Sequence, residues 1–224
     1  MADMMPWYKQ LWQDEGLYSH DPNDPGGETY RGITQRYHGR DIIWGMIDDR
    51  REEPNFPAIL DEDDAIQTRH MYIVRNDYWR KARGEDLHEN ARLIADVLAD
   101  VRFNQGTRAR EFVGKALQMT VSLALTPDNR PLVVDGRVGH NTVAAINMLA
   151  SSEGWPGLYP TIMVDTVGAR IEYYIRSTAN DPKKLRYLKG WYLRAMRQLR
   201  EVVVDSTYEP TLLELRDPPA APLA

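Results

Sequence analysis

The chain has 224 residues, no cysteine and a formal net charge of −5, from 28 basic and 33 acidic residues. This length is enough to bury a core in one compact domain or in two small lobes. The missing cysteines exclude disulfides, thiolate metal sites and a cysteine nucleophile. The acidic balance argues against a general nucleic-acid-binding protein, so we expect no nucleic-acid partner.

The first expected element is a helix over residues 6–16, with proline in its first turn and glycine as its C-cap. One stripe of this helix carries Tyr8, Leu11, Trp12 and Glu15, at the spacing i, i+3, i+4 and i+7. Partial burial on this stripe and the negative end of the helix dipole would both raise the pKa of Glu15. Such a carboxyl can act as a general acid. The alternative is that Glu15 lies at the rim of the stripe, with its carboxylate in water.

Residues 18–32 are rich in proline and glycine, so we expect a loop or one arm of a small hairpin there. Asp24 lies between two prolines, and Thr29 follows a pair of glycines. Hydrolysis of a glycosidic bond needs one carboxyl that donates a proton and a second that stays ionised. A hydroxyl can hold the water. Glu15, Asp24 and Thr29 supply these three groups within a short span.

The rest of the chain reads as helices joined by short loops, which predicts a mainly α fold. Asp61 opens a helix with acidic residues in its first turn, as the helix dipole favours. In the next helix, within 90–106, Asp100 and Asn104 fall on the face opposite the apolar one. Further helices are expected over 109–119, from about residue 141, over 161–177 and over 182–204.

The segment EGLYSHDPNDPGGETYRGIT, which begins at Glu15, resembles the signature of glycoside hydrolase family 108. These are phage-type N-acetylmuramidases, also called secretion activators. The family pattern is E-G-G-Y, then D-P-x-D-x-G-G-x-T, then G-I-T. Leu17 departs from it, and the resulting DEGL is similar to the opening of classical phage lysozymes. The departure leaves the glutamate in place and affects the shape of the loop.

Later segments also resemble this family: YW at residues 78–79, DVRFNQG at 100–106, DGRVGHNT at 135–142 and GWYLR at 190–194. The resemblance implies a lysozyme-like helical fold with a small β-hairpin or loop that carries the second carboxylate. It implies a muramidase catalytic region at 1–108 and a helical region at 109–204, packed on the first, that resembles a predicted peptidoglycan-binding domain. We expect residues 205–224, rich in proline and alanine, to form a flexible tail.

The implied activity is hydrolysis of the β-1,4 bond between N-acetylmuramic acid and N-acetylglucosamine in bacterial peptidoglycan. Glu15 would be the general acid, Asp24 the second carboxylate and Thr29 its partner. Two alternatives stay open. A lytic transglycosylase would use the glutamate alone and leave an anhydro-sugar end. A non-catalytic peptidoglycan-binding protein that assists secretion would keep the fold without needing the acid.

Four further residues are candidate substrate contacts. Tyr30 and Tyr78 are able to stack on sugar rings, although aromatic residues at such positions are more often part of the core. Asp100 and Asn104 are able to hydrogen-bond substrate, or only each other and solvent. No metal or cofactor is expected. The segment from Asp21 to Gly32 superficially resembles a calcium loop, but its twelfth position is glycine instead of glutamate.

The expected partner is bacterial peptidoglycan, and we expect a monomer. The segment from Lys183 to Arg200 is basic and keeps helical spacing of its apolar residues. Its basic face is either merely solvated or helps the protein to reach the anionic cell envelope. The N-terminus lacks the features of a signal peptide. We therefore expect synthesis in the cytoplasm and action on the cell wall in the periplasm after release by a holin or another route.

Overall fold

The structure is a computed structural model that describes residues 1–20, 26–126 and 129–205. It has a mainly α fold with a small antiparallel sheet, as the sequence predicted. Its helices are α1 Met5–Asp14, α2 Gln35–His38, α3 Ile43–Asp48, α4 Asp64–Ile73, α5 Arg92–Asn104, α6 Thr107–Ala124, α7 His140–Ala150, α8 Trp155–Asn180 and α9 Leu185–Asp205. Its strands are β1 Tyr18–Ser19, β2 Thr29–Tyr30 and β3 Ile33–Thr34. Between α4 and α5 the chain forms a π-helical segment, Val74–Trp79, followed by short 3-10 turns.

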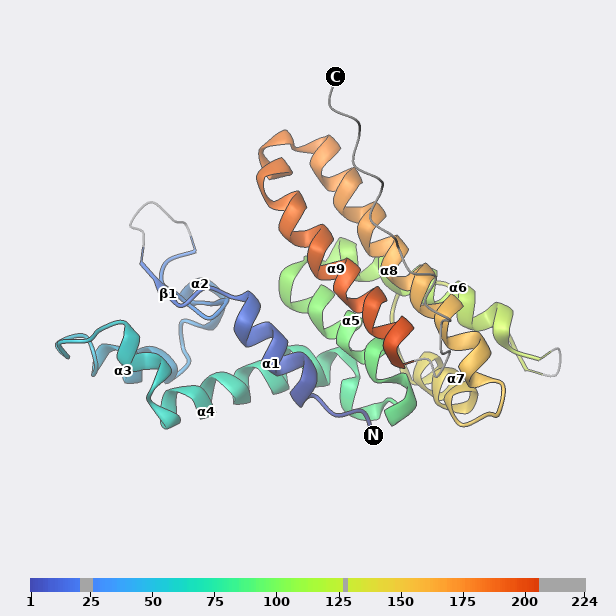
Figure 1. Cartoon of the computed structure of the whole chain (residues 1–224), viewed down its shortest axis with the longest axis horizontal. Helices are drawn as coiled ribbons and strands as arrows, with labels where there is room; N and C mark the ends of the chain where they lie inside the picture. The colour runs from blue at the N-terminus through green and yellow to red at the C-terminus, as the bar shows by residue number, and fades with distance from the viewer. Residues whose placement is uncertain (21–25, 127–128, 206–224) are drawn as a thin grey trace, which may run out of the picture.

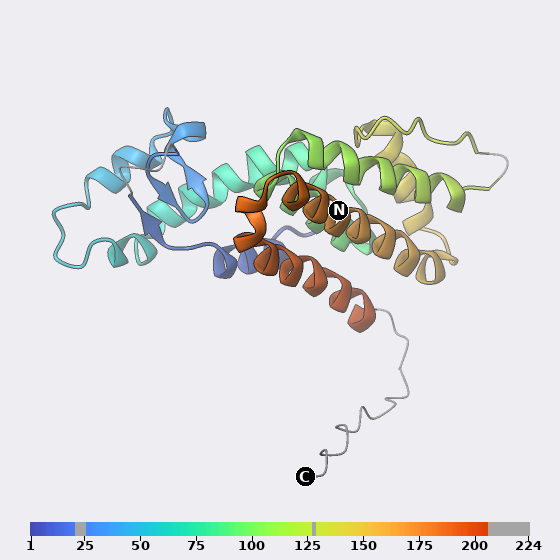
Figure 2. The ribbon, with the colours of Figure 1, turned by 90° about the horizontal axis from the view of Figure 1, so that it is seen from above.

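The sheet lies at one end of the molecule and α7 at the other (Figures 1 and 2). Its strands follow the order β1-β2-β3. The register places Tyr30 opposite both Tyr18 and Ile33, and Thr29 opposite Thr34. The two residues between β2 and β3, Arg31 and Gly32, have φ values of 48° and 79°. Positive φ at both central residues is typical of the tight turn that best fits the twist of a hairpin.

Helix α1 ends at Asp14, two residues before the glycine that was expected to cap it. Glu15 is the C-cap, with an extended backbone at φ −86° and ψ 142°, and its N–H donates to the carbonyl of Leu11. The helix buries Trp7, Tyr8 and Leu11 against the core. Glu15 is therefore placed where the chain leaves α1 for the sheet.

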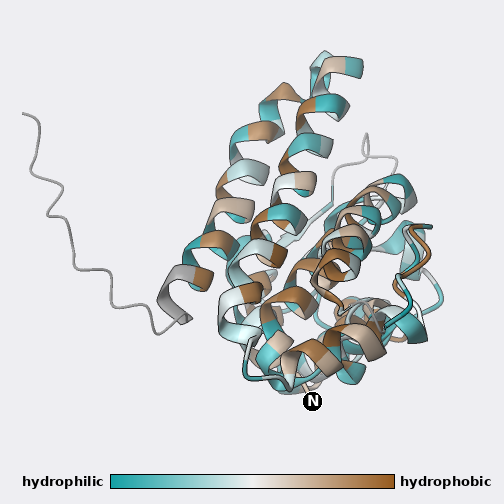
Figure 3. Cartoon of the chain, turned by 90° about the vertical axis from the view of Figure 1, so that its right-hand side faces the viewer, coloured by the Kyte–Doolittle hydropathy of each residue, from teal (hydrophilic) through white to brown (hydrophobic). Residues whose placement is uncertain are grey.

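Helix α5 runs through the middle of the molecule, beside α8 and α9 (Figure 1). Every residue from Leu93 to Val101 is buried. The face opposite the apolar one, on which Asp100 was expected, is therefore not exposed to solvent at this residue, since elements of both halves of the chain cover this helix. Hydrophilic and hydrophobic residues alternate along the long helices in Figure 3, as expected for helices with one buried side.

Helix α8 packs against both α6 and α9. Helices α8 and α9 run side by side in Figures 1 and 2, joined by the 3-10 turn Pro182–Lys184. Among the described helices, none combines the length and apolar character needed to span a membrane. The tail expected at 205–224 lies outside the described residues, except for Asp205.

Candidate active site

The side chain of Glu15 lies between the first half of the chain and the last helix. Two nitrogens of the Arg194 guanidinium, Nη1 and Nη2, each donate to Oε1 of Glu15 at 3.1 Å. The side chains of Glu15 and Arg194 are only 18% and 17% exposed. An ion pair with so little solvent around it interacts more strongly than a surface pair.

The other side of the Glu15 carboxylate faces the turn between β2 and β3. A Cβ atom at Gly32 would lie 2.9 Å from Glu15 Oε2 and 2.6 Å from a ring carbon of Phe103. Only a residue without a side chain lets the carboxylate and this ring approach the turn together. The positive φ of Gly32 adds a second requirement for glycine. The glycine of the G-I-T motif thus has a direct role in the shape of the site.

Arg31 anchors the end of α1 beside Glu15. Its Nη1 donates to the carbonyls of Trp12, at 2.6 Å, and of Glu15, at 3.4 Å. Its guanidinium lies 4.3 Å from the centre of the Trp12 ring and forms an ion pair with Asp61. A cation at the carbonyl end of a helix offsets the negative end of the dipole. The dipole is therefore a weaker influence on Glu15 than the sequence suggested.

Burial raises the pKa of the Glu15 carboxyl above its ordinary value. The Arg194 guanidinium opposes this increase, by its charge and by its hydrogen bonds, while the nearby carboxylates of Asp100 and Asp14 add to it. Burial is the largest of these effects. The protonated form that a general acid needs is thus favoured by the low exposure of the side chain.

A cluster of arginines and carboxylates surrounds this pair and joins α1, α5, α8 and α9. Both carboxylate oxygens of Asp14 accept from Nη1 of Arg197, at 2.9 and 2.7 Å. Asp100 pairs with the fully buried Arg170 and lies 3.7 Å from Arg194. These contacts fix the C-terminal end of α1 against α9 and join α5 to α8.

The predicted site residues differ in their placement in the structure. Asp24 lies outside the described residues. Thr29 is half-buried in β2, opposite Thr34. Tyr30 is completely buried, and its hydroxyl donates to the carbonyl of Leu60, so its placement is that of a core residue. The sugar contact predicted for Tyr30 has no support from this placement.

The remaining three candidates are also engaged in contacts within the protein. The hydroxyl of Tyr78 is 2.9 Å from Nε2 of His38, and its ring packs on Phe103, which contacts the site. Asn104 donates to the carbonyl and the carboxylate of Asp100, at 3.2 Å each. Asp100 is 4% exposed. A direct contact between Asp100 and substrate stays a prediction, and its present partners are Arg170, Arg194, Asn104 and Trp7.

Sequence reasoning missed Arg194, Arg31 and Phe103 as residues of the site. Arg194 is the arginine of the GWYLR segment, but no local pattern connects it to a glutamate near the other end of the chain. Arg31 lies inside the family motif at a variable position. Phe103 was counted only as part of a helix. Each of these residues acquires its role through a tertiary contact.

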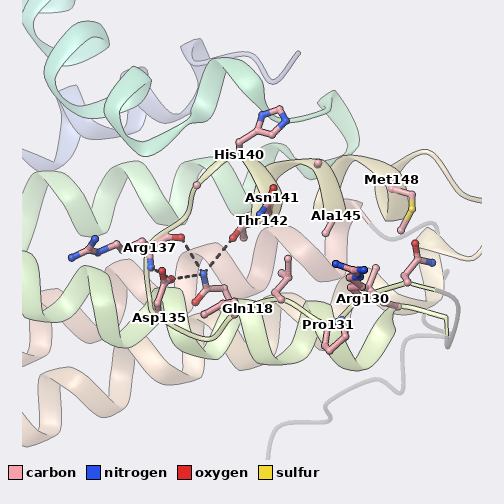
Figure 4. A pocket seen from close by; sticks show the side chains of 16 residues that line it. Gln118, Arg130, Pro131, Asp135, Arg137, His140, Asn141, Thr142, Ala145 and Met148 are labelled. Atoms are coloured by element: carbon pink, nitrogen blue, oxygen red, sulfur yellow. Dashed lines mark hydrogen bonds between the residues drawn. The ribbon is translucent and has the colours of Figure 1, made fainter.

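A separate cavity of about 770 Å³ lies between α6, α7 and the loop 129–139 (Figure 4). Gln118 lies at its base and joins the loop to α7 by donating to Asp135, at 2.9 Å, and to Thr142, at 3.3 Å. Arg130 and Met148 line the other end of the cavity (Figure 4). The cavity therefore combines a cationic side chain with apolar surface. Its residues belong to the second half of the chain, whereas Glu15 belongs to the first.

Within residues 1–20, 26–126 and 129–205, no group of three or more histidine or acidic side chains is arranged to hold a metal ion. The expectation that the protein uses neither metal nor cofactor stays a prediction.

Comparisons with known proteins match these two halves to two families. Residues 8–106 match the family model described as Glycosyl hydrolase 108, and residues 116–196 match the one described as Predicted Peptidoglycan domain. The chain is also similar to the structure of SagA from Brucella abortus, with a TM-score of 0.51 and 21% sequence identity. This similarity covers 92% of the present chain and 99% of SagA, and it supports the fold. A search of curated proteins finds no match.

Proposed function

Since residues 8–106 belong to the glycosyl hydrolase 108 family and are followed by a predicted peptidoglycan domain, we propose that the protein is an N-acetylmuramidase. It hydrolyses the β-1,4 bond between N-acetylmuramic acid and N-acetylglucosamine in peptidoglycan. One observation supports this best: Glu15 is a largely buried carboxyl with a raised pKa, at the edge of the hairpin of the family motif. A carboxyl in this state can donate a proton near neutral pH.

In the proposed reaction Glu15 protonates the glycosidic oxygen as the bond to the anomeric carbon breaks. Oε1 accepts hydrogen bonds from Arg194, so the proton to be donated resides on Oε2, the oxygen near Gly32. Asp24 stays ionised and stabilises the positive charge on the sugar or orients the water. Thr29 is its partner. The water ends on the anomeric carbon as a hydroxyl, and its proton returns to a carboxylate.

The product ends distinguish this reaction from its two alternatives. Purified cell wall is digested with the protein, and the soluble fragments are analysed by mass spectrometry. A muramidase releases fragments with a reducing muramic acid end. A lytic transglycosylase releases anhydro ends, and a non-catalytic binding protein releases nothing above the buffer control. The proposal requires reducing ends, and their loss in Glu15→Gln.

We further propose that the second half of the chain attaches the enzyme to its polymer. The match of residues 116–196 to a predicted peptidoglycan domain supports this role. The cavity between α6 and α7 is the best candidate for the attachment site, since Arg130 is suited to a carboxylate of the peptide stems. The apolar side chains around it suit methyl groups of alanine.

We also propose an endolysin role, in which the enzyme accumulates in the cytoplasm and reaches the wall through a holin. The basic residues of α9 form two groups. Arg194 and Arg197 turn inward to Glu15 and Asp14, whereas Arg186, Lys189 and others remain exposed and available to an anionic envelope. Expression in a bacterial host with and without a holin tests the release route. Lysis that needs no holin would contradict it.

A further inference from the structure

The ion pair between Arg194 and Glu15 joins residues near opposite ends of the sequence. Glu15 ends the first helix, inside the glycosyl hydrolase match, and Arg194 lies in the last helix, inside the predicted peptidoglycan domain. Both side chains are shielded from solvent, and two nitrogens of one reach one oxygen of the other. The contact is thus between the proposed acid, in one family region, and a residue that belongs to the other.

The two carboxylate oxygens of Glu15 have different neighbours. Arg194 holds Oε1 at 3.1 Å, while Oε2 lies toward Gly32 and the Phe103 ring. A guanidinium has no acceptor, so Oε1 accepts from it whether the carboxyl is ionised or protonated. In the protonated state the hydrogen is therefore directed to Oε2. Without Arg194 the carboxyl could rotate, and either oxygen could carry the proton.

The neighbours of Arg194 on α9 hold it firmly. The Trp191 ring stacks on Tyr174 of α8, with ring centres 5.1 Å apart. Ala195 is completely buried, and Gln198 accepts a hydrogen bond of 2.8 Å from the buried Arg170. One helical turn on either side of Arg194 is thus packed against α8. A guanidinium on so firm a support can restrict the carboxyl that it contacts.

The charged groups that face Glu15 come from several elements. Arg194 approaches from α9, Asp100 from α5 and Asp14 from α1 itself. Arg31, in the turn between β2 and β3, contacts the main-chain carbonyl of Glu15 instead of its carboxylate. Among the described residues, Arg194 is therefore the cation that acts directly on the carboxyl. Its removal would leave Glu15 beside two carboxylates, with no direct counterion from this part of the chain.

We propose that Arg194 is a positioning residue of the active site, which orients the Glu15 carboxyl so that Oε2 faces the hairpin. The second half of the chain is then part of the catalytic unit as well as an attachment region. This inference rests on the proposed role of Glu15 as the acid. It extends that role by assigning the orientation of the acid to a residue of the other family region.

The test compares Arg194→Met with Arg197→Met. Both variants remove one arginine of α9 that pairs with the end of α1, but Arg197 contacts Asp14 and not Glu15. We expect Arg194→Met to lower kcat on peptidoglycan by about 100-fold, the cost of a small misplacement of a reacting group. The decline of activity on the basic side of its pH profile should also shift to higher pH than in the wild type, because Glu15 without Arg194 keeps its proton up to a higher pH. Arg197→Met should lower Tm while kcat and the basic limb of the profile stay close to the wild type.

Arg194→Lys adds a conservative control. It keeps the positive charge and loses the two-nitrogen contact, so the basic limb should stay near that of the wild type while kcat falls. If Arg194→Met does not fold, this variant decides, and a kcat equal to that of the wild type overturns the proposal. If Arg194→Met folds and matches Arg197→Met in kcat and pH profile, the proposal is likewise wrong.

A second readout separates this inference from the proposed function. Carbon-13 NMR of labelled glutamate, with Glu15→Gln to assign the signal, follows the titration of Glu15 without any turnover. We expect its pKa to rise in Arg194→Met and to stay unchanged in Arg197→Met. If the wild-type protein does not cleave peptidoglycan, the proposed function fails, and this titration still tests the contact. An unchanged titration in Arg194→Met overturns the inference.

Discussion

The two halves of the chain are stabilised in different ways. In the first half, short elements are joined by polar side chains that reach the backbone, such as Arg31 at the end of α1 and His70 at the carbonyl of Arg31. In the second half, helices of 18, 26 and 21 residues pack along their lengths. The glutamate of the family motif lies in the irregular half. The regular half provides a rigid support and contributes one arginine to the site.

This difference indicates a division between chemistry and support. A carboxyl at a helix end can be surrounded by turns and partly desolvated, whereas a carboxyl in the middle of a surface helix is easily hydrated. The long helices offer few such positions, but they hold a side chain at a fixed place relative to the first half. The following predictions test this division.

The largest effect is expected from Glu15→Gln, which keeps the shape of the side chain and removes its acidic proton. Loss of general acid catalysis should lower turnover by about 10²–10⁴-fold with unchanged helicity. Asp14→Asn is the matched control, because this neighbouring carboxylate pairs with Arg197 of α9, the helix that also carries Arg194. Turbidity assays and circular dichroism on both variants test the prediction. Strong residual lysis by folded Glu15→Gln would exclude Glu15 as the acid.

The second carboxylate is tested by Asp24→Asn and Asp21→Asn, both outside the described residues. We expect Asp24→Asn to cut turnover sharply with little change in Tm, because this residue leads into the double glycine where a sugar ring can approach. Asp21→Asn should cost about 1 kcal/mol of stability through a lost turn hydrogen bond and leave much of the turnover. Thermal melts and turnover per folded molecule distinguish them. The reverse pattern would exchange the two roles.

The polar interior of the first half predicts a specific acid sensitivity. His70 is completely buried, with one ring nitrogen 3.1 Å from the Tyr8 hydroxyl, and burial lowers its pKa to about 4. In the unfolded chain its pKa is about 6.5, so the unfolded state binds more protons between these values. Stability is therefore present above about pH 6.5 and is lost as the pH falls toward about 4, by about 3 kcal/mol.

Denaturant unfolding across this pH range, with His70→Gln as the comparison, measures the effect. The variant lacks the titrating group, so its stability should change less between pH 6.5 and 4. Equal slopes for the two proteins would show that other groups cause the acid sensitivity.

The shape of the turn beside Glu15 is tested by Gly32→Ala. The added Cβ would contact Phe103 and Glu15 Oε2 at less than van der Waals distance, and the backbone would be strained at φ 79°. We expect a loss of roughly 1–3 kcal/mol in stability and a reduced turnover at temperatures where the variant is folded. Gly16→Ala is the control, because, apart from its chain neighbours, no atom of the described residues lies within 4 Å of a Cβ placed there. Similar melts for the two variants would contradict the proposed contact.

The smallest effect is expected in the second half, away from the acid. Arg130→Glu should weaken retention on purified cell wall by about tenfold, the cost of one charge-assisted hydrogen bond. Turnover on short soluble glycan fragments should stay unchanged. Arg108→Glu makes the same charge change at an exposed site of α6 that does not line the cavity. Equal retention of the two variants would move the attachment site elsewhere.

The sequence by itself determined the class of fold and the position of the motif. Periodicity, proline and glycine predicted α1 and, at residues 18–32, a loop or one arm of a hairpin, because these signals act within a few residues of the chain. The C-cap of α1 is Glu15 instead of the predicted Gly16, since Arg31, in the turn beyond the helix, hydrogen-bonds to the last carbonyls. The motif from Glu15 to Thr34 also indicated the family whose model residues 8–106 match.

Only the tertiary structure decided which side chains act together. Asp100 was predicted on the face of α5 opposite the apolar one. In the structure it is buried and forms an ion pair with Arg170, because this central helix is covered on all sides. Tyr30 became a core residue whose hydroxyl donates to the carbonyl of Leu60. The contact of Arg194 with Glu15 joins residues 179 positions apart. Local patterns carry no information about such a pair, since the packing of α9 on α8 and α5 determines the distance between the Arg194 guanidinium and the Glu15 carboxylate.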